Sequence, residues 1–212
     1  MPNELADRII PLYERYAAEW DRDRKAAPWN DRCWIERFAS ELPRGATVLD
    51  LGCGPGEPIA HYLAEHGFRV TGVDASPSMI AICRNRLPDH EWIVCDMRTV
   101  NIGRRFDGIL AWDSYFMLPH EDQARMFEVF ARHAKESTIL MFNSGPTHGE
   151  AIGEYRGEPL YAASLFAEEY RALLAQHGFA VIDHVVEDRR AGGRTVWLVR
   201  HADENNSATP SN

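Results

Sequence analysis

The sequence predicts an α/β protein built on a doubly wound, seven-stranded sheet that is mostly parallel. Three observations carry this prediction. Short apolar segments alternate with segments of helical periodicity from about residue 47 onward. A glycine-rich turn follows the first apolar segment. The last two apolar segments are joined by a connection too short for a crossover helix, so we expect them to form an antiparallel end to the sheet.

Two helices are expected before the first strand, over residues 4–20 and 31–42, because apolar side chains recur there in steps of three and four. The charged run at 21–25 is expected to lie between them as a solvated segment. We therefore divide the chain into an N-terminal helical cap (1–44), a sheet domain (45–201) and a polar tail (202–212) that is expected to be disordered.

The strands and helices of the sheet domain follow in regular alternation. Strands are expected at 47–51, 69–74, 92–95, 106–112, 138–143, 179–186 and 195–200, and helices near 58–66, 76–86, 122–134 and 167–177. The stretch 144–163 is expected to be irregular, and a loop of this length in a compact domain is usually functional or mobile.

Composition excludes several classes of protein. The net charge of -9 argues against a general nucleic-acid binder, because neutralising phosphates requires a basic surface. The four cysteines include no C-x-x-C pair, so neither a zinc site nor a disulfide framework is indicated, and no other metal site is expected. No apolar run approaches membrane-spanning length and the N-terminus carries no signal peptide, so we expect a cytoplasmic protein.

The segment 48–57 carries the most informative motif, with glycines at alternate positions after a buried strand. Asp50, Gly52, Gly54 and Gly56 form a D-x-G-x-G-x-G pattern, and the third glycine of a dinucleotide fingerprint is replaced by Glu57. The glycine loop and the helix behind it are expected to offer backbone N–H groups to a carboxylate-bearing ligand. The pattern resembles motif I of the class I S-adenosylmethionine-dependent methyltransferases, which implies their Rossmann-like fold and S-adenosyl-L-methionine as cofactor, with S-adenosyl-L-homocysteine as product.

Further residues at strand ends extend this resemblance. Asp74 lies about 20 residues beyond the glycine loop, where an acid can accept hydrogen bonds from ribose hydroxyls. The resemblance implies that Asp96 accepts from the adenine amino group and that Met97 flanks the ring. The segment ending at Trp112 and Asp113 resembles motif IV, beside the transferable methyl group. The complete expected cofactor set is Tyr13, Asp50, Gly52, Cys53, Gly54, Gly56, Asp74, Ala75, Met79, Asp96, Met97 and Trp112.

The acceptor side is less specific. A base is needed only for a nucleophile that is protonated near neutral pH, and His120 is the first candidate for it, counted with Asp113 as catalytic, whereas His148 is the second. Where many bacterial small-molecule methyltransferases carry a histidine before a Leu-Pro pair, this sequence has Met117. The residues expected to line the acceptor pocket or its lid are Tyr16, Trp20, Trp29, Tyr115, His148 and Tyr161.

The sequence thus predicts an enzyme that methylates a small molecule, with no nucleic-acid or membrane partner, as a monomer or homodimer. A non-catalytic cofactor-binding protein on the same fold is an alternative. An NAD-dependent oxidoreductase is a second alternative, and Glu57 argues against it.

Overall fold

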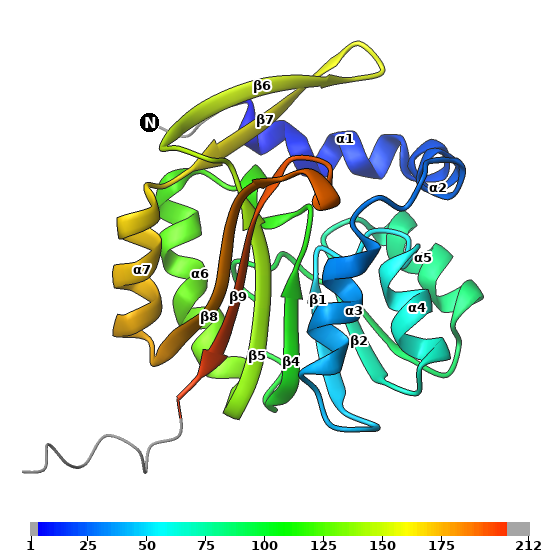
Figure 1. The fold of residues 1–212 in the computed structure, drawn as a ribbon. Helices are drawn as coiled ribbons and strands as arrows, with labels where there is room; N and C mark the ends of the chain where they lie inside the picture. Colours follow the sequence, from blue (N-terminus) through cyan, green and yellow to red (C-terminus); the bar gives the residue numbers. More distant parts are fainter. Residues whose placement is uncertain (1–3, 203–212) are drawn as a thin grey trace, which may run out of the picture.

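The sheet of the computed structural model, which describes residues 4–202, has seven strands in the order β3-β2-β1-β4-β5-β9-β8. Strand β9 runs antiparallel to both of its neighbours, and the pairs on the other side of β5 are parallel. This arrangement confirms the predicted fold class (Figure 1). The strands are β1 (Thr47–Leu51), β2 (Arg69–Asp74), β3 (Glu91–Val94), β4 (Phe106–Ala111), β5 (Ala134–Ser144), β8 (Phe179–Asp188) and β9 (Arg194–His201).

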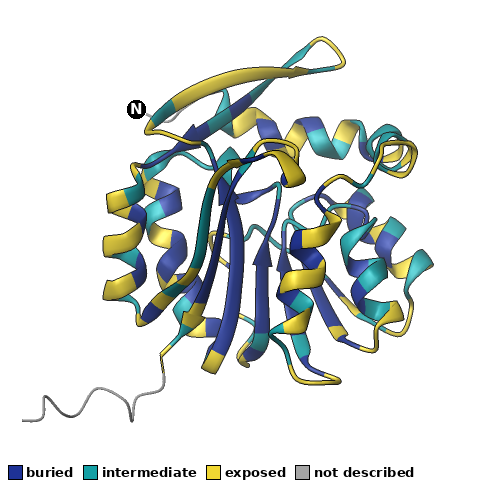
Figure 2. Ribbon diagram, viewed as in Figure 1, coloured by how far each residue is buried: buried dark blue, intermediate teal, exposed yellow. Residues whose placement is uncertain are grey.

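Helices cover both faces of the sheet. On one face, α3 (Arg32–Ser40), α4 (Ile59–Glu65) and α5 (Pro77–Arg86) pack into one apolar cluster with β1 and β4. On the other face, α6 (His120–His133) and α7 (Ala167–Gln176) pack into a second, aromatic-rich cluster. The central strands are consequently buried along most of their length (Figure 2), as expected for parallel strands covered on both sides.

The N-terminal helices differ from the prediction. After the short helix η1 (Ala6–Arg8), α1 (Ile9–Arg15) ends at Tyr16, and α2 (Ala17–Ala26) continues through the charged run that we expected to be a solvated connection. The run is helical because its charges find partners. Asp21 pairs with Lys25 one turn later at 2.8 Å and with Arg86 of α5 at 2.7 Å.

The expectation of an irregular segment at 144–163 is wrong. Most of it forms a β-hairpin of β6 (Gly149–Tyr155) and β7 (Glu158–Ser164), which pair in register. The two residues of the turn, Arg156 and Gly157, both have positive φ, at 54° and 81°. Such a two-residue turn matches the twist of the strands that it joins.

The hairpin and the N-terminal helices lie together over the carboxyl ends of the parallel strands (Figure 1). Tyr155 donates a hydrogen bond to Asp23 of α2 at 2.7 Å, and its ring lies edge-on to that of Trp20. Arg15 of α1 pairs with Glu158 at 2.7 Å. Two segments that are distant in the sequence therefore form one roof over the edge where ligands bind in open α/β sheets.

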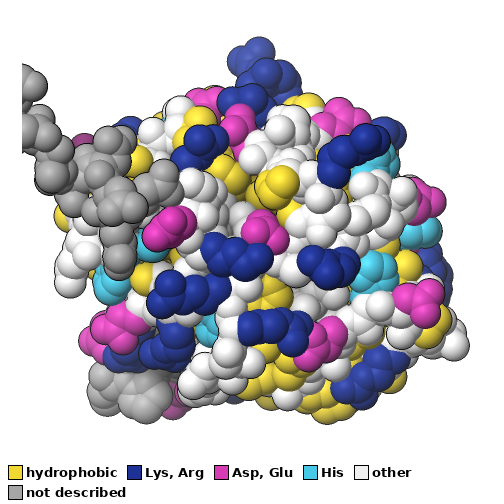
Figure 3. All heavy atoms as spheres, turned by 90° about the horizontal axis from the view of Figure 1, so that it is seen from below, with side chains coloured by type: hydrophobic (Ala, Val, Ile, Leu, Met, Phe, Trp, Pro, Cys, Tyr) yellow, Lys and Arg dark blue, Asp and Glu magenta, His cyan; other side chains and the backbone are white. Residues whose placement is uncertain are grey.

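The opposite side of the molecule, seen from below in Figure 3, carries Lys and Arg side chains interspersed with acidic ones.

No helix within residues 4–202 is long and apolar enough to cross a membrane. The expected disordered tail lies outside the described residues except for Ala202. The division at residue 44 stays a prediction, because α3, which precedes it, packs into the same apolar cluster as β1.

Candidate functional site

Three cavities open beneath the roof, and they meet at two residues. The first, of about 120 Å³, lies between α1 and the ends of β2 and β3. The second, of about 650 Å³, lies under the hairpin, and the third, of about 50 Å³, lies beside the glycine loop. Trp20 of α2 and Asp113, which follows β4, line all three cavities.

The glycine loop is folded tightly onto β2. Gly52 has φ of 75°, and a Cβ there would lie 2.3 Å from the Cβ of Ser114, so this position requires glycine. The amide of Gly52 donates to the carbonyl oxygen of Val73 at 2.7 Å, and the amide of Gly54 donates to Asp74 Oδ2 at 2.9 Å. The expectation that these loop amides hold a carboxylate is therefore wrong, because the end of β2 already accepts from them.

Asp74 is held in place by the backbone on both sides. Its Oδ2 accepts from Gly54 and its Oδ1 accepts from the amide of Ser76 at 2.9 Å, which leaves lone pairs on both oxygens for a ligand in the first cavity. Burial raises the pKa of Asp74 above its usual range. Ser76 caps α5 by accepting from the amide of Met79. Glu14 of α1, which no sequence pattern marked, accepts from Ser76 and Ser78 and connects the N-terminal helices to this wall of the cavity.

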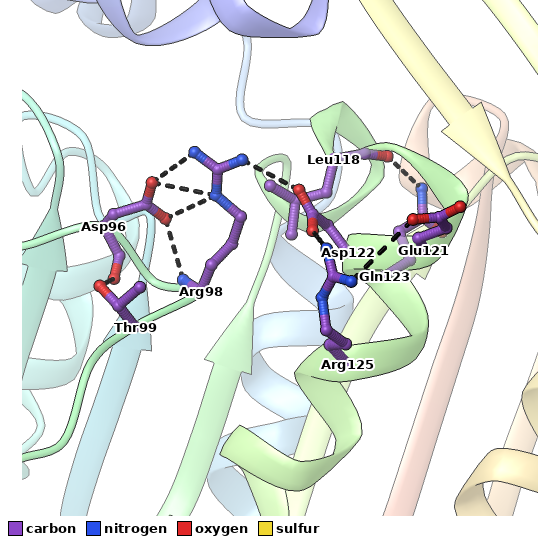
Figure 4. Close-up of polar contacts among 8 residues, drawn as sticks. All are labelled: Asp96, Arg98, Thr99, Leu118, Glu121, Asp122, Gln123 and Arg125. Carbon is purple, nitrogen blue, oxygen red and sulfur yellow. Dashed lines mark hydrogen bonds and ion pairs between the residues drawn. The ribbon is translucent and has the colours of Figure 1, made fainter. Parts of the chain in front are cut away.

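Asp96 enters the first cavity from the loop after β3 with its carboxylate already clamped. Arg98 Nε lies 3.0 Å from each Asp96 oxygen, and Nη2 lies 2.6 Å from Oδ2. The other end of the guanidinium donates to Asp122 of α6 at 2.9 Å, and Asp122 in turn accepts from Arg125 (Figure 4). Arg98, which no sequence motif singled out, also lines the first cavity.

Most of the expected cofactor residues line the first or the third cavity. Those of the first cavity are Tyr13, Gly52, Gly54, Asp74, Ala75, Met79, Asp96 and Met97. Those of the third are Asp50, Gly52, Cys53, Gly54 and Trp112. Gly56 lines none of the three cavities, which corrects its assignment as a contact residue. A Cβ at this position would lie 3.2 Å from Cys83 Sγ, so Gly56 instead supports the loop from behind.

The third cavity contains two groups of opposite charge. Asp50 is buried, and this burial, together with the nearby charge of Asp74, raises the pKa of Asp50 to about 7. Arg24 of α2 lines the same cavity and also the second. Among the described residues, the only acid paired with Arg24 is Asp113, at 3.8 Å, which is too far for a direct hydrogen bond.

Asp113 was expected to be catalytic, and its oxygens are engaged by other side chains. Arg194 of β9 donates to Oδ1 and to Oδ2 at 2.7 Å each, and Asn143 donates to Oδ1 at 2.9 Å. This bidentate pairing occupies both oxygens of the carboxylate, so neither is directed at an acceptor in the second cavity. Asp113 therefore anchors the junction of the cavities, and a role as general base is not supported.

Trp20 lies at the junction within an aromatic cluster. Its ring is edge-on to Tyr13 at a centroid distance of 5.0 Å and to Tyr155 of the hairpin at 5.1 Å. The buried hydroxyl of Tyr13 has no hydrogen-bond partner among residues 4–202, and Tyr13 lines both the first and the second cavity. A buried hydroxyl normally has such a partner, so this one is available to a ligand. Burial raises the pKa of Tyr13, so the phenol is neutral.

His120, the first candidate base, is corrected by its contacts. Its Nε2 lies 3.1 Å from the carbonyl oxygens of both Gly149 and Ser164, which pair with each other at the open end of the hairpin. Since carbonyl oxygens only accept, Nε2 carries a proton and donates it to them. His120 lines none of the three cavities. It fastens the hairpin instead.

Of the residues expected around the acceptor, Trp20, His148 and Tyr161 line the second cavity. The other three do not, and their assignments are corrected. Tyr115 is fully buried in the core, where its hydroxyl donates to the carbonyl oxygen of Gln123 at 3.0 Å. Trp29 packs edge-on against Tyr62, and Tyr16 packs against the hairpin outside the cavities. Large aromatic side chains at these positions stabilise the fold and its roof.

The comparisons agree with this geometry. Residues 48–137 match a family model described as a methyltransferase domain. The chain is 30% identical over 138 residues to a putative methyltransferase, YqeM, of Bacillus subtilis, covering 62% of this chain and 55% of the relative. It is 36% identical over 126 residues to a trans-aconitate 2-methyltransferase of Escherichia fergusonii, covering 55% and 46%. The chain thus spans about half the length of these curated relatives.

Among solved structures, 1,6-didemethyltoxoflavin-N1-methyltransferase of Burkholderia thailandensis is similar with a TM-score of 0.75 and 20% identity, covering 96% of this chain and 91% of that one. The protein therefore has the class I methyltransferase fold. Residues 48–137 thus resemble a methyltransferase domain, and the relatives to which the chain is similar are methyltransferases.

Proposed function

We propose that this protein transfers a methyl group from S-adenosylmethionine to a small-molecule acceptor. The observation that carries the proposal is the meeting of three cavities at Trp20 and Asp113. A sulfonium sulfur has three substituents, and each cavity suits one of them. The first cavity suits the nucleoside, the third suits the amino-acid chain, and the methyl group would face the acceptor in the second.

The third cavity suits an amino-acid end because it contains one acid and one base. Asp50 is a buried carboxylate with no basic side chain beside it among the described residues, and an ammonium group would supply the missing positive charge. Arg24 has donors left over for a carboxylate. A zwitterion would thus satisfy two groups that have few partners of their own.

The first cavity suits a nucleoside. Asp74 has free lone pairs for the two hydroxyls of a ribose. Asp96 lies farther along the same cavity to accept from the adenine amino group, and Met97 and Met79 present apolar, polarizable surface to the ring.

Bound S-adenosylmethionine supplies a methyl group on a positively charged sulfur, which an oxygen, nitrogen, sulfur or carbon nucleophile attacks in line. The chain would contribute mainly orientation, and holding two reactants in register can supply about 7–11 kcal/mol of the barrier. The Trp20 ring provides an aromatic surface beside a cation. Asp113 also lines the junction of the cavities, but Arg194 balances its negative charge. The junction therefore offers no unpaired carboxylate to the sulfonium.

His148 is our candidate for the group that accepts the proton of the acceptor. Its Nδ1 lies 3.0 Å from Glu169 Oε2, and the pKa of Glu169 is lowered by the amide of Phe166 and by this contact, so Glu169 is ionised. Nδ1 must then carry a proton, so the neutral tautomer that fits this contact has its lone pair on Nε2. Nε2 has no hydrogen bond within residues 4–202, and His148 lines the acceptor cavity.

The first experiment compares S-adenosylhomocysteine with NADH by thermal shift and calorimetry on the purified protein. The proposal predicts stabilisation by S-adenosylhomocysteine alone. Binding without methyl transfer to any acceptor in a broad panel of small carboxylates, phenols and amines would favour a non-catalytic cofactor-binding protein instead. We also propose a cytoplasmic location, supported by the four cysteines, all of which are free thiols.

A further inference from the structure

Arg98 connects Asp96, the residue predicted to recognise the adenine, to helix α6. The Asp96 carboxylate receives four contacts from this one residue, three from the guanidinium and one from its backbone amide at 2.9 Å. An aspartate carboxyl group otherwise turns freely about its terminal bond. With both oxygens gripped in the plane of a rigid fork, the orientation of the Asp96 carboxylate is fixed.

The guanidinium is itself fixed from behind. Its Nη1 donates to Asp122 at 2.9 Å, in the first turn of α6. The next residue, Gln123, donates to the carbonyl oxygen of Leu118 at 2.8 Å, and Leu118 lines the first cavity (Figure 4). The clamp thus joins the loop after β3 to α6 across the wall of the nucleoside cavity.

A fixed, ionised carboxylate discriminates between hydrogen-bond donors and acceptors. A carboxylate that faces an N–H group gains a charge-assisted hydrogen bond, whereas facing a carbonyl oxygen it meets only lone pairs. A carboxylate free to turn could instead move away from the oxygen and regain water. If the nucleoside lies as in the proposed function, Asp96 faces the exocyclic substituent at position 6 of the purine.

We propose that Arg98 is a specificity-determining positioning residue. It holds the Asp96 carboxylate in the orientation that accepts from a purine 6-amino group, and so selects a 6-amino nucleoside over a 6-oxo nucleoside. This inference rests on the proposed function, since it requires that the first cavity binds the nucleoside of S-adenosylmethionine.

The test measures affinity for two ligands that differ at this one position, S-adenosylhomocysteine and S-inosylhomocysteine, by titration calorimetry. Arg98→Met removes the guanidinium at similar side-chain length, and Arg98→Lys keeps the charge without the fork. Arg125→Met is the matched control, because Arg125 contacts the same Asp122 from outside, has a side chain that is 67% exposed and lines none of the three cavities. Circular dichroism and thermal unfolding verify that each variant is folded.

The wild type should bind the amino ligand roughly 10- to 100-fold more tightly than the oxo ligand. In Arg98→Met this ratio should fall to within about threefold, with Arg98→Lys in between and Arg125→Met unchanged. A wild-type ratio near one, or a ratio that is retained in Arg98→Met or lost equally in Arg125→Met, overturns the inference. If the wild type binds neither ligand, the proposed function itself fails, which is a different result.

Discussion

The buried Asp50 gives the sharpest prediction, because its ionisation couples cofactor binding to pH. In the folded protein the pKa of Asp50 is about 7, whereas in an unfolded chain it is about 4. The folded state therefore holds this proton more tightly. The contribution of this proton to the free energy of unfolding is fully present below pH 4 and is lost as the pH rises through 7. From pH 5 to pH 8.5 the loss is on the order of 3 kcal/mol, at about 1.4 kcal/mol per pH unit below the folded pKa.

Replacing Asp50 with asparagine removes the titrating group at nearly constant shape. We expect the free energy of unfolding of the wild type to fall by this amount relative to Asp50→Asn over the same pH range. Chemical denaturation at several pH values measures it, and Asp89→Asn, at an exposed turn position, serves as the control. Parallel pH dependence of the wild type and Asp50→Asn would refute the reasoning.

The ionisation of Asp50 also controls the affinity for the ligand. If the ammonium group of S-adenosylhomocysteine pairs with ionised Asp50, the affinity should rise by roughly 30-fold from pH 5.5 to pH 8.5 and level off above pH 7. Calorimetry at each pH measures this dependence. A wild-type affinity that is independent of pH across this range would show that the amino-acid end does not lie beside Asp50.

Three further variants test other parts of the site. Trp20→Ala should weaken binding of S-adenosylmethionine more than binding of S-adenosylhomocysteine, by roughly 2- to 5-fold in the ratio, because only the former carries a positive charge on sulfur; equal weakening in competition assays would indicate a purely structural role. His148→Gln should reduce turnover about 10²-fold or more with an acceptor that carries a protonated nucleophile, and should remove the acidic limb of the pH–rate profile, whereas an unchanged limb would exclude His148. Tyr115→Phe should cost about 1–3 kcal/mol of stability, measured by denaturation, through the lost bond to the carbonyl oxygen of Gln123, and loss of cofactor binding at full stability would contradict its core position.

The sheet and the glycine loop were predictable because local chemistry determines them. Strands β1 and β2 are short apolar runs with an acid at or next to the last residue, and Gly52 occupies a position where the neighbouring Ser114 leaves no room for a Cβ. Asp74 was predictable from its distance to the loop. These features depend on residues that are near one another in the sequence or that follow the regular alternation of strands and helices.

The roof was not predictable in the same way. Strand β6 is exposed along nearly all its length and contains Ile152 as its only β-branched residue, so it has no alternating apolar pattern to mark it as a strand. The hairpin is held by contacts with α1 and α2, which are more than 100 residues away: Tyr155 of β6 contacts α2 and Glu158 of β7 contacts α1. The Arg156-Gly157 turn was the one local signal that pointed to a hairpin.

Individual functional roles also depended on distant partners. Asp113 and His120 have side chains suited to proton transfer. Arg194, however, donates to both oxygens of Asp113, and His120 Nε2 is bound to two backbone carbonyl oxygens of the hairpin. Nothing in the sequence distinguishes Arg98 from other surface arginines, because its role depends on Asp122, 24 residues further on. Pairing across the fold decides which polar groups remain available to a ligand.

The most direct test of the central claim is the affinity of Asp74→Ala for S-adenosylhomocysteine, measured by calorimetry next to the wild type. If a ribose is held at the end of β2, the wild type binds and the variant, still cooperatively folded, loses about 100-fold or more of its affinity, since two charge-assisted hydrogen bonds disappear. Equal affinity in the two proteins would mean that the nucleoside lies elsewhere.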